Sequence, residues 1–133
     1  MSHENVDMVR KAFEAYSAGG IESLLPFYAP DVVLYPDPEW PEDSVYEGHH
    51  GARKQDALWV DNFDDYGWEA HEIRDLDEVV LALAETTGRA KASGAPFRQQ
   101  QGIVASDFRD GTIGQVRFFT TWQQTLEAAG LEA

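Results

Sequence analysis

The stretch that most constrains the fold is a predicted β-hairpin near the end of the chain. Residues 97–109 and 112–119 are rich in Phe, Val, Ile, Thr and Gln, and Asp110-Gly111 separates them. Asp-Gly between two such runs favours a tight turn, because glycine adopts positive φ without steric cost. At about 3.3 Å per residue, strands of this length form the middle of a sheet rather than its edge. Each earlier segment should therefore supply another strand or a helix that covers one face.

The rest of the chain predicts helices that alternate with short strands, followed by long strands. The predicted helices are residues 2–18, 21–28, 50–63 and 120–129, and the predicted strands before the hairpin are residues 31–35, 45–47, 68–76 and 78–87. Neither a repeat nor a linker interrupts this order, so residues 1–133 are expected to form a single domain. Helices gathered on one side of an antiparallel sheet are the α+β layer arrangement. A sheet of this kind coils, and its concave side is either filled by a helix or left as a pocket.

Charge and composition exclude several classes of function. The chain has 24 acidic and 10 basic residues and a net charge of −14, which disfavours binding to nucleic acid or to anionic membranes. It has no cysteine, and this excludes disulfides, a thiol nucleophile and cysteine-ligated metals. No apolar run approaches the ~18 residues of a membrane span. We expect a soluble, cytoplasmic protein that needs no cofactor.

Short motifs along nearly the whole chain resemble one protein family. They are Asn5-Val6 with Phe13, residues 16–19, residues 28–32, residues 45–51, residues 93–96, residues 108–113 and residues 126–131. Together they resemble the SnoaL-like group of the nuclear transport factor two-like superfamily. The resemblance implies a conical α+β barrel, in which a strongly curved, mostly antiparallel sheet wraps around the N-terminal helices and leaves an apolar pocket. It also implies a homodimer that forms through the outer face of the sheet.

The positions that match known active-site residues of this superfamily hold other residues in this chain. Ketosteroid isomerases of this superfamily use a carboxylate base, a first-helix tyrosine and a late-strand acid, and the matching positions hold Pro36, Ala12 and Ser106. Many SnoaL-like chains carry Asp at the end of the last strand, where this chain has Thr121. A threonine does not exchange a proton near neutral pH. These differences shift the balance from catalysis towards binding.

Three residues are candidate catalytic groups. Asp37 lies between two prolines at the predicted rim of the pocket, where burial would raise its pKa and suit it to act as a general base. The alternative is a solvated aspartate in a turn. Tyr16 and His71 are the candidate hydrogen-bond donors, although a single histidine in a strand is more often a surface residue than a catalyst.

Aromatic and glutamine side chains are the candidate ligand contacts. The aromatic set is Tyr16, Tyr35, Trp40, Trp59, Trp68, Phe118 and Trp122. Gln99 and Gln101 would need partners if they face inward, and there they could bind a ligand carbonyl or hydroxyl. Alternatively, the glutamines face outward at a dimer surface. His49-His50 is not expected to bind a metal, because adjacent side chains diverge and no third ligand follows at metal spacing.

Three functions follow from these observations. The first is a cavity that binds a small, mostly apolar molecule, of a polyketide or steroid type. The second is an acid/base enzyme, an isomerase, cyclase, hydrolase or dehydratase, that uses Asp37 as general base. The third is a dimeric interaction module without a ligand. Whether the chain is an enzyme stays open at this stage, and the direction of the Asp37 side chain separates the first two functions.

Overall fold

One mixed sheet forms the centre of the computed structural model, which describes residues 2–37 and 45–131. Within these residues the sheet has six strands in the order β2-β1-β6-β5-β4-β3. The strands are β1 (Tyr28–Tyr35), β2 (Tyr46–Glu47), β3 (Phe63–Asp75), β4 (Val80–Ala90), β5 (Pro96–Arg109) and β6 (Thr112–Phe119). Neighbouring strands are antiparallel except β1 and β6, which run parallel. The sheet is not closed, because β2 and β3 remain its two edges.

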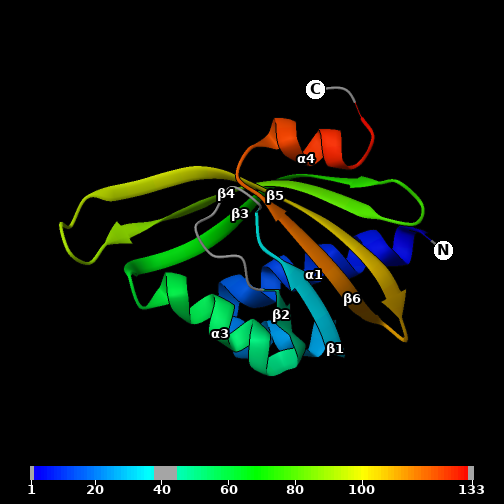
Figure 1. The fold of residues 1–133 in the computed structure, drawn as a ribbon, viewed down its shortest axis with the longest axis horizontal. Helices are drawn as coiled ribbons and strands as arrows, with labels where there is room; N and C mark the ends of the chain where they lie inside the picture. Colours follow the sequence, from blue (N-terminus) through cyan, green and yellow to red (C-terminus); the bar gives the residue numbers. More distant parts are fainter. Residues whose placement is uncertain (1, 38–44, 132–133) are drawn as a thin grey trace.

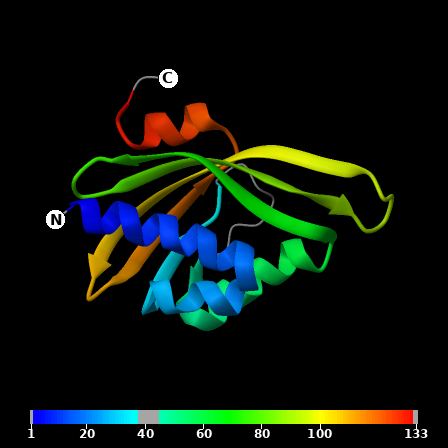
Figure 2. The ribbon, with the colours of Figure 1, turned by 180° about the vertical axis from the view of Figure 1, so that it is seen from behind.

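Helices cover both faces of the sheet. They are α1 (Ser2–Gly19), α2 (Ile21–Leu24), the 3-10 turn η1 (Leu25–Phe27), α3 (Gly48–Val60) and α4 (Trp122–Ala128). Figures 1 and 2 show α1 and α3 together on one face of the sheet and α4 on the opposite face. We call these the inner and outer faces. This cone-shaped α+β arrangement confirms the predicted fold class. None of the described helices is long and apolar enough to cross a membrane.

The predicted hairpin is confirmed. Strands β5 and β6 pair from Gly102 with Phe119 to Arg109 with Thr112. Both turn residues have positive φ, 50° at Asp110 and 77° at Gly111. This is the conformation of a type I′ turn, whose twist matches that of the flanking strands. The hairpin therefore sets the register of the two strands that cross the centre of the sheet.

Several predicted boundaries were wrong, most clearly those of the second and third helices and of the strands that follow them. The second helix ends at Leu24 instead of residue 28, because Pro26 lacks the amide hydrogen that a continuing helix needs, and β1 starts at Tyr28. The third helix ends at Val60 instead of residue 63, and strand β3 starts at Phe63 instead of residue 68. The register shifts between Asp64 and Gly67, and Asp65 has a φ of 54°. Such a bulge lets an acidic, glycine-containing stretch remain in a strand.

The core lies between the inner face and α1. Val9 of α1, Val32 of β1 and Val116 of β6 are each 1% exposed or less. They belong to one apolar cluster that also contains Ile103 of β5 and Phe118 of β6. The apolar stripe predicted for the first helix thus packs against the sheet, and the outer face is left to α4.

Candidate functional site

A cavity of about 90 Å³ lies between the inner face of the sheet and the helices beneath it. Its walls are mainly apolar and come from distant parts of the chain. They include Val9 and Phe13 of α1, Trp68 of β3, Ile103 of β5 and Phe118 of β6. The sheet bends over α1 and α3, and the cavity is the space that their side chains do not fill.

Polar side chains meet at the end of the cavity formed by α1 and α3. The hydroxyl of Tyr16 donates a hydrogen bond of 2.5 Å to Oδ1 of Asp56. Gln55 also lines the cavity and is 8% exposed, and its Nε2 has no hydrogen-bond partner among the described residues. Tyr66 lies nearby, and its hydroxyl accepts a hydrogen bond of 3.0 Å from Nε1 of Trp68. The cavity therefore offers a carboxylate and a free amide donor within apolar walls.

Burial governs the protonation of these groups. It raises the pKa of Asp56, and the carboxylate of Asp61 adds to this effect, while the hydrogen bond from Tyr16 opposes it. Burial also raises the pKa of Tyr16, and the hydrogen bond to Asp56 raises it further. The pKa values of Tyr28 and Tyr66 are raised by burial and, to a smaller extent, by the charge of Asp56. The phenol groups of Tyr16, Tyr28 and Tyr66 therefore stay protonated at neutral pH. They take part in the site as neutral hydrogen-bonding groups.

Aromatic rings surround the polar end. Trp59 stacks on Tyr66 with 5.8 Å between ring centroids and 13° between planes. Trp68 contacts Phe13 at 6.1 Å and meets the ring of Phe118 edge-on, also at 6.1 Å. Such pairs hold large rings in fixed positions. The walls around the Asp56 carboxylate are thus preorganised.

Four of the predicted ligand contacts line this cavity. They are Tyr16, Trp59, Trp68 and Phe118. They come from α1, α3, β3 and β6, so the fold brings together residues that lie far apart in the sequence. This group contains one of the three candidate catalytic residues, Tyr16.

The side chain of Asp37 does not line the cavity that contains Tyr16. This side chain is completely buried. Its Oδ2 accepts a hydrogen bond of 2.5 Å from the backbone N–H of Thr120, just after β6. In this position the carboxylate ties the end of β1 to the end of β6.

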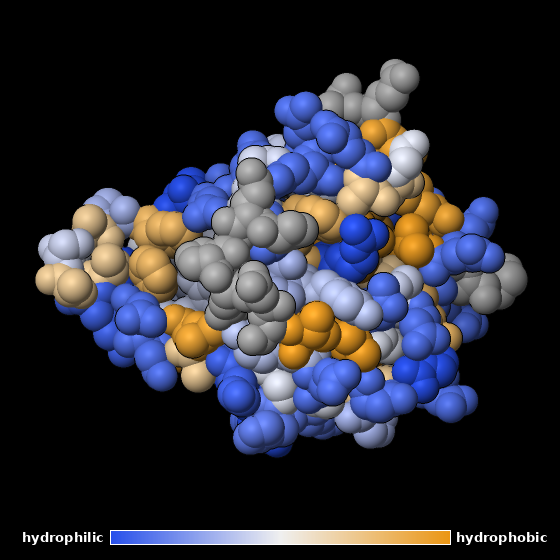
Figure 3. Space-filling view, viewed as in Figure 1, coloured by the Kyte–Doolittle hydropathy of each residue, from blue (hydrophilic) through white to orange (hydrophobic). Residues whose placement is uncertain are grey.

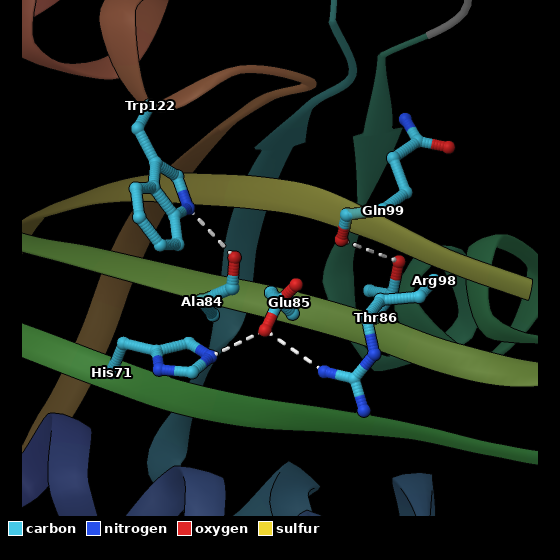
Figure 4. A network of polar contacts seen from close by, with 7 residues as sticks. All are labelled: His71, Ala84, Glu85, Thr86, Arg98, Gln99 and Trp122. Carbon is cyan, nitrogen blue, oxygen red and sulfur yellow. Dashed lines mark hydrogen bonds and ion pairs between the residues drawn. The ribbon is translucent and has the colours of Figure 1, made fainter.

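His71 lies on the outer face, as Figure 4 shows. Its Nε2 is 2.7 Å from Oε1 of Glu85, which also accepts a hydrogen bond of 2.9 Å from Arg98. The ring centroids of Trp122 and His71 are 5.6 Å apart. The indole Nε1 of Trp122 donates a hydrogen bond to the carbonyl of Ala84. Neither His71 nor Trp122 lines the cavity. Trp122 instead anchors the start of α4 on the sheet.

The remaining predicted contacts have other positions. Tyr35 is 39% exposed and does not line the cavity, and Trp40 lies outside the described residues. Gln99 is half-buried, and its backbone carbonyl accepts from the hydroxyl of Thr86 at 3.5 Å. Gln101 is 1% exposed, and neither Nε2 nor Oε1 has a hydrogen-bond partner in the described part of the chain. Neither glutamine is a cavity-lining residue.

Gln55 and Asp56 are functional candidates that we did not predict. A signal for them exists in the sequence, because Ala52, Gln55, Asp56 and Trp59 recur at spacings of three and four within the third helix. That spacing puts all four on one helical face. A polar pair inside an otherwise apolar helical stripe indicates either a pocket or a buried pair, and here all four residues line the cavity.

No three His, Asp or Glu side chains within residues 2–37 and 45–131 come close enough together to hold a metal ion. His49 is occupied in another way. Its Nε2 lies 3.0 Å from the carbonyl oxygen of Tyr28, which links the start of α3 to β1.

The open cone and the apolar cavity define an α+β protein with the ketosteroid isomerase-like fold. The family model for the SnoaL-like domain matches residues 9–116. Since this match spans well over half of the sequence, the chain belongs to the SnoaL-like family. Curated protein sequences give no match.

Three similar crystal structures place the fold in context. A protein with ketosteroid isomerase-like fold from Catenulispora acidiphila, in complex with trimethylamine, has a TM-score of 0.73 and 14% identity, over 93% of this chain and 92% of its own. A SnoaL-like polyketide cyclase from Jannaschia sp. CCS1 has a TM-score of 0.74 and 18% identity, over 88% and 85%. TerC, co-crystallised with polyporic acid, has a TM-score of 0.75 and 14% identity, over 88% and 91%. At these identities the likeness establishes the fold alone.

Proposed function

We propose that this chain binds a small, mostly apolar molecule in the cavity beneath the sheet. The observation that carries the proposal is the polar end of that cavity, where the Asp56 carboxylate and the free Nε2 of Gln55 lie within aromatic walls. Small-molecule sites combine mainly apolar walls with a few convergent polar groups. A buried amide donor without a partner costs free energy, and a ligand oxygen would remove that cost.

The volume of the cavity limits the size of the ligand. About 90 Å³ is well below the roughly 300–1,000 Å³ of sites that enclose drug-sized molecules. A ligand of a few non-hydrogen atoms fits this volume, whereas a steroid or polyketide requires the lining side chains to move. The similar structures that hold trimethylamine and polyporic acid support ligand binding within this fold.

Cyclohexanone is a suitable first probe, because it combines an apolar ring with one oxygen that Gln55 could hydrogen-bond. We expect it to raise the thermal unfolding temperature in proportion to its occupancy. Ala12 lines the cavity and is 6% exposed, so Ala12→Leu should fill part of the space and weaken binding. Ala70→Leu, in β3 and outside this cavity, is the matched control. Equal binding by wild type and Ala12→Leu would place the ligand elsewhere.

A second candidate function is acid/base catalysis, with Asp56 rather than Asp37 as the base. The supporting observation is that burial raises the pKa of Asp56 beside two possible donors, Tyr16 and Gln55. Raised carboxylate pKa values suit general bases. In this reaction the carboxylate would take a proton from the carbon next to a ketone, and the Nε2 of Gln55 would stabilise the resulting enolate oxygen.

The same probe separates binding from catalysis. Cyclohexanone in D₂O exchanges the hydrogens next to its carbonyl, and NMR measures the rate. A faster exchange with the wild-type protein that disappears in Asp56→Asn supports the enzyme. Binding of cyclohexanone without faster exchange supports a binding protein and contradicts catalysis by Asp56 on ketones of this size.

We also propose a homodimer that forms through the outer face of the sheet. Helix α4 covers part of this face, and the side chains of His71 and Arg98 remain exposed beside it (Figure 4). Oppositely charged groups such as Glu85 and Arg98 suit a self-complementary two-fold contact. Sedimentation at micromolar concentration should give twice the mass of one chain, and the mass of one chain would contradict the dimer.

A further inference from the structure

Among residues 2–37 and 45–131, the carboxylate in the cavity has no cationic neighbour. Within the described residues, the hydrogen bond to Asp56 comes from the neutral phenol of Tyr16, and the other charge that acts on it is the carboxylate of Asp61. None of the described residues that line the cavity is Lys, Arg or His. Carboxylates that are removed from water in proteins are normally paired with a cation or a metal ion, and Asp56 is half-buried. A positive charge is therefore the group that this site lacks.

Aromatic side chains line the cavity together with this carboxylate. Trp59 lies three positions after Asp56 on the inner side of α3, and its ring stacks on that of Tyr66. Tyr28 and Tyr66 are close enough for the charge of Asp56 to act on their hydroxyls. The faces of such rings attract cations within about 6 Å. Carboxylate and rings together favour a ligand that is positively charged and covered with alkyl groups.

We infer that the cavity binds a small organic ammonium ion, with its charge facing Asp56 and its alkyl groups against Trp59 and Tyr66. This inference rests on the proposed function and names the chemical class of the ligand. The volume of about 90 Å³ restricts the ion to a few non-hydrogen atoms. The free Nε2 of Gln55 is available for an oxygen on the same ligand, such as the hydroxyl of an amino alcohol.

The charge of the whole protein acts in the same direction. A net charge of −14 raises the local concentration of cations and lowers that of anions. Figure 3 shows hydrophilic residues around the rim of the face in view, with apolar patches between them. A small cation is thus drawn towards the protein by its surface and held inside the cavity by Asp56.

The test compares two probes of nearly the same shape and different charge. The tert-butylammonium ion is charged at neutral pH, as the lysine ammonium group is, and tert-butanol is its neutral counterpart. Calorimetric titration at pH 7.5 and low salt gives the affinity of each. We expect wild-type protein to bind the ammonium ion at least tenfold more tightly than the alcohol.

Two variants locate the source of this preference. Asp56→Asn removes the charge with little change of shape, and we expect it to bind both probes with similar affinity. Asp61→Asn is the matched control, because it removes a nearby carboxylate that does not line the cavity. It should keep the preference for the cation.

The wild-type protein supplies a test that needs no variant. The titratable groups that face Asp56 are Tyr16 from α1, Tyr28 from β1, Tyr66 from β3 and Asp61 at the end of its own helix. The phenols stay neutral, so the protonation of Asp56 determines the pH dependence. Affinity for tert-butylammonium should rise as the pH increases through the raised pKa of Asp56, while that for tert-butanol should not change.

Each outcome decides a different point. A preference for the cation that depends on Asp56 and on pH supports the inference. Equal or tighter binding of tert-butanol overturns the inference and leaves the proposed function standing. Binding of neither probe, together with no rise in the unfolding temperature with cyclohexanone, overturns both, whereas binding of cyclohexanone alone overturns only the inference. A preference that survives in Asp56→Asn overturns the inference too, because the cation would then bind elsewhere.

Discussion

The hydroxyl of Tyr16 and the carboxylate of Asp56, 40 positions apart in the sequence, form a hydrogen bond of 2.5 Å that joins α1 to α3 at the end of the cavity. This bond connects the two helices that form the floor beneath the inner face of the sheet. It also supplies the donor that offsets part of the cost of burying a carboxylate. Stability and the proposed ligand binding therefore depend on the same pair.

Tyr16→Phe removes this donor and leaves the ring in place. Hydrogen bonds to charged groups contribute about 1.5–3 kcal/mol, so we expect the free energy of unfolding at pH 7 to fall by about 1–3 kcal/mol. Urea unfolding measures the change. Tyr35→Phe is the matched control, because its side chain is 39% exposed, and it should change stability by less than about 0.5 kcal/mol. Equal losses in the two variants would contradict a special role for the pair.

The raised pKa of Asp56 predicts a pH dependence of stability. Burial is its main cause, and it means that the folded protein binds this proton more tightly than the unfolded chain does. Protonation of Asp56 therefore favours folding at pH values below the unfolded pKa of about 3.9, and this contribution is lost as the pH rises through the folded pKa. The Asp56→Asn variant lacks the carboxyl proton and therefore lacks this pH-dependent contribution to stability.

The difference in unfolding free energy between Asp56→Asn and wild type isolates this effect. We expect it to shift in favour of the variant as the pH increases from 3.5 to 7.5. Asp31 and Glu22 have lowered pKa values because of Arg109 and Arg53, but they are present in both proteins, so their contributions cancel. A difference that is constant across this range would show that the pKa of Asp56 is the same in the folded and unfolded chain.

Local sequence predicts much of the fold and fails at its irregular points. The turn at Asp110-Gly111 and the apolar stripe of the first helix follow from backbone geometry and periodicity, and both were placed correctly. The bulge near Asp65 was not, because an acidic residue with positive φ belongs to a turn on local evidence. Only the pairing of β3 with β4 keeps it in a strand. Tertiary context decided that boundary.

The lining of the cavity was predictable in part among the aromatic residues, since Trp59 and Trp68 line it and Trp122 does not, and it was not predictable among the carboxylates. Trp59 and Trp68 are large and apolar, and the fold has few places other than the inner face for them. The position of an aspartate cannot be predicted in this way, because most aspartates are exposed to solvent. Asp37 and Asp56 both have plausible local contexts, and only the pairing of β1 with β6 and the position of α3 determine that Asp37 bonds to Thr120 while Asp56 faces the cavity.

Gln101 offers a way to stabilise the protein. It is 1% exposed, and neither polar atom of its side chain has a partner among the described residues. An unpaired buried polar group costs about 1–3 kcal/mol, so Gln101→Met, which keeps the length of the side chain, should raise the free energy of unfolding by about 1 kcal/mol or more. Gln99→Met is the control at a half-buried position and should have little effect. A loss of stability in Gln101→Met would reveal a hydrogen bond to this amide.

The docking of α4 on the outer face depends on the absence of a side chain at Gly102. A Cβ there would lie 1.9 Å from Oγ1 of Thr125 and 2.7 Å from its Cβ and Cγ2, closer than atoms can approach. Thr125 is fully buried, and its hydroxyl donates to the carbonyl of Thr121, so it cannot turn away without losing that bond. Gly102→Ala should therefore displace α4 and lower the free energy of unfolding by about 1–3 kcal/mol.

Two further variants separate this clash from a general effect of adding a methyl group to a strand. Gly67→Ala, in β3, places its Cβ where no atom lies within 4 Å, so it should leave stability almost unchanged. Thr125→Ala removes the obstacle, so the double variant of Gly102 and Thr125 should lose less than the sum of the two single losses. Hydrogen exchange of the amides after Thr125 reports directly on α4. If Gly102→Ala leaves their protection intact, or if the two losses simply add, α4 is not held by the fit between Gly102 and Thr125.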